Sequence, residues 1–118
     1  MLDKEVQDIE KFLLSSDATF YLALLSKEND IKDAKFSSIF RKKGNELFGK
    51  KDLCYLEYLK VLFYFNGSIA YAPDKSDELI NAYSNRSLLL LHLKKYDLSL
   101  IDIDRVLGMT QSTALQKS

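Results

Sequence analysis

The chain has 118 residues, of which 47% are hydrophobic and 29% charged, and its 17 basic side chains balance 17 acidic ones. This composition favours one folded domain with a core, and the zero net charge gives no reason to expect binding of nucleic acid or of an anionic membrane. One Cys and one His exclude an internal disulfide and a zinc site with several such ligands, so we expect no cofactor. The start of the chain lacks the layout of a secretory signal, so we expect a cytoplasmic or nuclear protein.

The first 34 residues predict helices that pack on or cap the rest of the chain. Residues 2 to 14 place apolar side chains on one side and charged ones on the other, as in an amphipathic helix. A second short helix is expected over residues 18 to 26, where apolar side chains lie nearly all round. A polar linker is predicted to follow it.

Residues 37 to 52 predict the first helix of a helical hairpin. Gly44 lies inside this helix, where Gly costs up to ~1 kcal/mol relative to Ala, so we expect a second helix to come close to it. The side chains expected to face inward are Ile39, Phe40, Leu47 and Phe48.

The second helix of this hairpin includes the very apolar segment LCYLEYLKVLFYF, residues 53 to 65. A membrane span needs ~20 apolar residues, and Glu57 and Lys60 interrupt this segment, so we expect a buried central helix and no membrane. Remaining aromatic surface that contacts a membrane surface or a partner is the alternative.

Residues 82 to 107 predict a second hairpin, with a turn at Lys94 and Lys95. Small residues at Ser87 and Ser99 would let the two helices approach closely. On the second helix, the three-and-four spacing selects Tyr96, Ser99 or Leu100, Ile103, and Val106 or Leu107. We expect Gly108 to end this helix and residues 108 to 118 to form a flexible tail.

The two hairpins, residues 37 to 73 and 77 to 107, resemble tetratricopeptide repeats, whose period is about 34 residues. The resemblance rests on FRKKGNELFGKKD from Phe40, on Tyr71-Ala72-Pro73, and on the small residues of each hairpin. It implies an all-α fold of antiparallel hairpins stacked as a right-handed superhelix that binds proteins. Counts forward from Gly44 and back from Pro73 differ by five residues, so we expect a longer turn or an extra helical turn near residues 53 to 58.

The segments FRKKGNELFGKKD, YAPDKSDELINAYSNRS and LLHLKKYDLSLIDIDRVL together are similar to the repeats of the SET-and-MYND group of lysine methyltransferases. In that family, methyl transfer needs a SET domain and a zinc module rich in Cys and His, and the sequence shows neither. We therefore expect that this chain is not itself an enzyme. It would be a fragment of such a methyltransferase or, alternatively, a stand-alone co-chaperone adaptor.

A third repeat is missing, and the outer face of the predicted helix over residues 96 to 107 has nothing to cover it. Either the chain is a piece of a longer protein or it self-associates through this helix. His92 stands alone among leucines, which favours a packed or surface histidine over a catalytic one. The basic residues between Lys35 and Lys60 lack a base-stacking motif, which disfavours a nucleic-acid site.

Arg41 and Asn45 are four residues apart and project from one face of their helix, and stacking of the repeats would bring Asn85 beside them. In tetratricopeptide domains that bind the C-terminal carboxylate of Hsp90 or Hsp70, the matching positions form part of a clamp. The resemblance therefore implies that these three residues bind a peptide carboxylate. The alternative is that the two asparagines only hold helices together.

Overall fold

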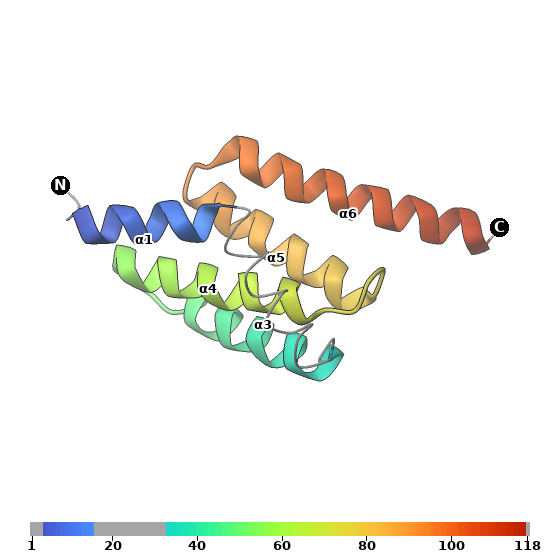
Figure 1. The fold of residues 1–118 in the computed structure, drawn as a ribbon, viewed down its shortest axis with the longest axis horizontal. Coiled ribbons are helices and arrows are strands. Elements are labelled where there is room, and N and C mark those ends of the chain that lie inside the picture. The colour runs from blue at the N-terminus through green and yellow to red at the C-terminus, as the bar shows by residue number, and fades with distance from the viewer. Residues whose placement is uncertain (1–3, 16–32, 118) are drawn as a thin grey trace.

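The computed structural model describes residues 4–15 and 33–117, which form five helices and no strand (Figure 1). This confirms the predicted all-α class. The helix expected at residues 18 to 26, and most of the linker after it, lie outside the described residues. The helices are α1 (Lys4–Leu14), α3 (Ala34–Phe48), α4 (Tyr55–Tyr71), α5 (Asp77–His92) and α6 (Tyr96–Lys117).

The helices are arranged as two hairpins with α4 at the centre (Figure 1). Helices α3 and α4 form the first hairpin, and α5 and α6 form the second. Helix α5 lies against both α4 and α3, whereas α1 lies against α4. The apolar segment of the sequence is therefore the central helix, as predicted. No helix in the described ranges is both long enough and apolar enough to cross a membrane.

Small residues stand where the helices approach each other, which confirms this part of the sequence analysis. A Cβ atom added to Gly44 would lie 2.5 Å from Cε1 of Phe65, which is fully buried on α4. At the other end of the same hairpin, Ser37 Oγ donates to the carbonyl oxygen of Ser68 at 2.7 Å. In the second hairpin, Ser99 Oγ donates to the carbonyl oxygen of Ser87 at 2.8 Å.

The core consists mainly of α4 side chains. Val61, Leu62 and Phe65 are buried together with Leu89 of α5, and burial of each side chain of this size stabilises the fold by about 1.5–3 kcal/mol. The prediction that Ile39 faces inward is wrong, because its side chain is 41% exposed. Helix α3 buries only one face against its neighbours, and the successive side chains of a helix point about 100° apart. Its neighbour Phe40 instead faces α4, where its ring stacks on that of Tyr71 with centroids 5.5 Å apart.

The five extra residues of the first hairpin are divided between a loop and a helix. The connection in the first hairpin covers residues 49–54, whereas that in the second covers only 93–95. In addition, α4 begins three residues early, while α3 ends one residue early when Gly44 is matched to Ser87. When α4 and α6 are aligned by matching Leu62 to Leu100, the first residue of α4, Tyr55, corresponds to Leu93. Helix α6 begins only at Tyr96, three residues later. Both expected alternatives, a longer turn and additional helix, are therefore present.

Helix α6 differs from the prediction in its length. It continues through Gly108 to Lys117, so the expectation that Gly108 ends the helix is wrong. A single Gly costs a helix only about 1 kcal/mol, and no sequence signal such as Pro follows Gly108 to stop the helix.

The inward face of α6 also differs from the prediction. Ser99 is buried as expected, but so is Asp102, which was not among the residues expected to face inward. Four of the apolar residues selected by the spacing are exposed instead, namely Tyr96, Leu100, Ile103 and Leu107. Among the described helices α6 contacts only α5, so one face is covered, and that face contains the polar residues.

Candidate functional site

The candidate carboxylate site lies on α3 and α5, which pack side by side. Arg41 is in the middle of α3, and its Nε is 3.4 Å from Oε2 of Glu78, in the first turn of α5. The two side chains are 20% and 24% exposed, so water reaches both. Ser76 fixes the start of α5 by accepting a hydrogen bond from the backbone N–H of Leu79. The arginine required by the hypothesis is therefore present, but an acidic side chain of the same protein already contacts it.

The two asparagines of the predicted site have different environments. Asn45 is exposed one turn after Arg41 on α3, whereas Asn85 on α5 is half-buried. The Nδ2 atom of Asn85 is buried and has no hydrogen-bond acceptor among the described residues. A buried donor without an acceptor costs about 1–3 kcal/mol. No hydrogen bond within the described ranges joins these three predicted residues to one another, so the structure brings their helices together without linking their side chains.

His92 packs against aromatic side chains, in line with the sequence analysis. Its Nε2 is 3.1 Å from the hydroxyl oxygen of Tyr58, and its ring centroid is 5.7 Å from that of Phe48. In the part of the chain that the structure describes, no group of three or more His, Cys, Asp or Glu side chains is placed to hold a metal ion.

A buried ion pair between the two helices of the second hairpin was missed by the sequence analysis. Arg86 binds Asp102 through two parallel hydrogen bonds, with Nε–Oδ2 at 2.7 Å and Nη2–Oδ1 at 2.8 Å. Arg105 adds a contact of 3.2 Å from its Nη1 to Oδ1 of Asp102. The guanidinium groups of both arginines lie over the ring of Tyr83, at 5.5 and 5.2 Å from its centroid. Asp102 is 1% exposed, so this pair fixes the orientation of α6 on α5.

The same ion pair is connected to two further helices. Arg86 Nη1 donates to Oδ1 of Asn66 on α4 at 3.0 Å, and Asn66 Nδ2 donates to the carbonyl oxygen of Leu13 on α1 at 2.9 Å. A sequence signal for this network did exist, because Asp102 follows Ser99 by three residues and so shares its buried face. An acid on a buried face requires a basic partner, and Arg86 is adjacent to Ser87, the residue that Ser99 contacts.

Two titrating side chains of α4 are perturbed by their surroundings. Burial, together with a hydrogen bond and charge repulsion from Glu10, raises the pKa of Tyr55 to about 12. The backbone N–H of Cys54 donates to Glu57 at 3.1 Å and lowers the pKa of that carboxyl below its usual value of 4.5. Glu10 also contacts Lys95 Nζ at 3.3 Å. The raised pKa of Tyr55 therefore reports the attachment of α1 through Glu10, and the lowered pKa of Glu57 reports the hydrogen bond at the start of α4.

Comparison with known proteins gives one distant relative. The chain is 29% identical over 94 residues to the protein-lysine N-methyltransferase SMYD4 of Pongo abelii, and the match covers 79% of this chain but only 11% of that protein. No protein-family model and no solved structure gives a significant match. The similarity supports the expected relationship to a SET-and-MYND methyltransferase, whereas the assignment to tetratricopeptide repeats stays a prediction.

Proposed function

We propose that this chain is a protein-interaction module of the tetratricopeptide type that binds the C-terminal carboxylate of a peptide between α3 and α5. The observation that carries the proposal is the buried Nδ2 donor of Asn85, which has no acceptor among the described residues and lies on the helix that contacts Arg41. A guanidinium and two amides can donate several hydrogen bonds to one carboxylate. The acidic tails of Hsp90 and Hsp70 are the expected ligands.

Glu78 provides a sharp test of this site. A peptide carboxylate would have to compete with Glu78 for Arg41, so we expect weak binding by the natural chain. Substitution Glu78→Gln removes the competing charge and should strengthen binding of a peptide with an acidic, free C-terminus. Arg41→Ala should weaken binding by about tenfold or more, because a hydrogen bond to a charged group contributes roughly 1.5–3 kcal/mol.

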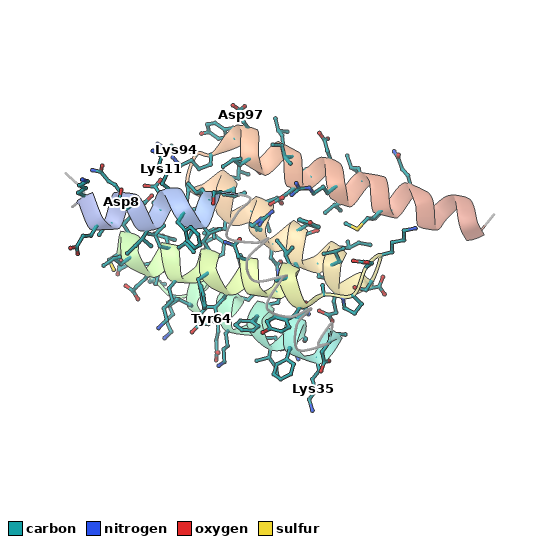
Figure 2. The ribbon with its side chains drawn as sticks, in the orientation of Figure 1. Asp8, Lys11, Lys35, Tyr64, Lys94 and Asp97 are labelled. Atoms are coloured by element: carbon teal, nitrogen blue, oxygen red, sulfur yellow. The ribbon has the colours of Figure 1, made fainter. Side chains whose placement is uncertain are left out.

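The matched control for Arg41→Ala is Lys35→Ala, which removes the same charge from the same helix. Figure 2 shows Lys35 pointing away from the other helices, so its loss should leave binding almost unchanged. Affinities are measured by isothermal titration with the natural peptide and with the same peptide amidated at its C-terminus. Binding that ignores both Arg41→Ala and amidation would refute the carboxylate site.

We further propose that the chain belongs to the repeat region of a SET-and-MYND lysine methyltransferase, which the distant similarity to SMYD4 supports. This chain would then supply protein binding in the cytoplasm or nucleus, while methyl transfer would depend on sequence elsewhere. Sequencing of the complete transcript is the test. SET and MYND sequence in the same reading frame supports this origin, whereas its absence favours the alternative of a stand-alone co-chaperone adaptor.

A further inference from the structure

The outer face of α6 carries a row of exposed apolar side chains. Tyr96, Leu100, Ile103 and Leu107 are 56%, 57%, 38% and 50% exposed and follow one another at steps of three and four residues. They therefore form one continuous stripe along the helix, which we call the α6 stripe. Figure 1 shows α6 at the edge of the molecule, with α5 along one side and no other described helix on the other. Exposed apolar surface of this kind marks interaction sites.

The α6 stripe corresponds residue by residue to a surface of α4 that already binds a helix. Each stripe residue follows its counterpart on α4 by 38 residues, the counterparts being Tyr58, Leu62, Phe65 and Ile69. On α4, Leu62 and Phe65 are buried in one cluster with Leu89 of α5, and Leu93 packs against the same cluster. The α6 stripe therefore repeats the chemistry of a surface that α5 covers on α4.

The polar contacts of α5 on α4 show which charge such a helix should carry. Arg86 of α5 donates to Asn66 of α4 at 3.0 Å, and the residue that follows Asn66 by 38 is Asp104, an exposed acid beside the α6 stripe. A helix that docks on α6 as α5 docks on α4 would place its equivalent of Arg86 against Asp104. Because Asp104 offers a carboxylate where Asn66 offers an amide, an arginine of the docking helix should bind there more strongly than Arg86 binds Asn66.

We propose that the α6 stripe binds an amphipathic helix of another protein, in which an arginine is followed by leucines three and seven residues later. This is the spacing of Arg86 and Leu89 in α5 and of Leu93, which directly follows that helix. The arginine pairs with Asp104, and the leucines cover Leu100 and Ile103. This surface is separate from the carboxylate site on α3 and α5, so the two proposals succeed or fail independently.

The charges beside the α6 stripe disfavour a second copy of this chain as the occupant. Asp97 and Asp104 are both exposed and lie seven residues apart along the same edge of the stripe. Figure 2 shows Asp97 at the outer side of α6, pointing away from the other helices. Two copies that packed stripe against stripe would bring these acids together, and such contact between like charges destabilises helix pairs. A helix with arginine at the matching position has the complementary charge.

The test uses the full chain and a fluorescent peptide with the sequence of residues 77 to 95, which contains the proposed pattern. Anisotropy should show saturable binding, and Leu100→Asp or Ile103→Asp should weaken it by at least about tenfold, since a charge placed in an apolar interface lacks a partner. The matched control is Ile39→Asp, which changes an isoleucine of similar exposure on α3, a helix that does not contact α6, and should leave affinity unchanged.

Charge reversal distinguishes this docking from non-specific apolar association. Asp104→Arg should weaken binding of the natural peptide and restore binding of a peptide in which Arg86 is replaced by Glu. Failure of the peptide to bind, or binding that ignores the Leu100, Ile103 and Asp104 substitutions, overturns the proposal. A dimer in sedimentation experiments that Ile103→Asp dissociates also overturns it, because the occupant would then be a second copy.

Discussion

Removal of Asp102 should be among the most destabilising single changes in this chain. In Asp102→Ala, Arg86 loses both of its hydrogen bonds to the Asp102 carboxylate, at 2.7 and 2.8 Å, and keeps the hydrogen bond to the amide oxygen of Asn66. The Arg86 side chain is only 13% exposed, so its largely buried charge loses the carboxylate that faces it. Breaking a buried pair in this way costs about 3–5 kcal/mol, a large part of the 5–15 kcal/mol that stabilises a typical domain.

The assay is urea unfolding followed by circular dichroism, with two comparison variants. Arg105→Ala removes an arginine that is 48% exposed and contacts the same carboxylate, so it should cost less than about 1 kcal/mol. The double variant Arg86→Met, Asp102→Leu removes both charges and should recover most of the stability lost in Asp102→Ala. If Asp102→Ala costs no more than Arg105→Ala, the claim that a buried ion pair holds the second hairpin together is refuted.

Two further predictions concern the glycines and the start of α4. Gly44→Ala should destabilise the fold by about 1–3 kcal/mol, because the added Cβ would lie 2.5 Å from the buried Phe65 ring. Gly108→Ala should stabilise the fold by up to about 1 kcal/mol, because no atom lies within 4 Å of the added Cβ. Equal changes in the melting temperatures of the two variants would contradict this reasoning. Because its pKa is lowered on folding, ionised Glu57 stabilises the fold above its unfolded pKa, and this contribution is lost as pH falls through the folded value. The melting temperature of Glu57→Gln should therefore lie below that of the natural chain at pH 7 and meet it below pH 4.5, and a difference independent of pH would contradict the assignment.

The helical hairpins could be predicted because their signals are local. Gly44 inside a helix, and Ser87 and Ser99 at matching positions of two others, have few explanations other than close approach of a second helix. The apolar run that became α4 was too short and too interrupted for a membrane and too apolar for a surface helix. Burial at the centre of the molecule followed from that composition.

The orientation of α6 was predicted only in part, because Ser99 indicated the covered face whereas the apolar spacing indicated a different one. Periodicity shows which side chains share a face of a helix, but the neighbouring helices decide which face is covered. Asp102 is inward because Arg86, 16 residues earlier, neutralises it, and this pairing depends on how two helices dock. For the candidate site, the sequence placed Arg41 and Asn85 on neighbouring helices but gave no sign that Glu78 would contact the arginine.

The attachment of α1 has a consequence for how the molecule opens. Helix α1 has no buried residue, and the contacts that attach it include the edge packing of Leu13 and Leu14, the Leu13 carbonyl and Glu10. Elements with so few buried contacts detach at a free energy well below that of global unfolding. Detachment of α1 would uncover part of the α4 core while both hairpins stayed intact. The chain would then expose apolar surface at α4 as well as at α6.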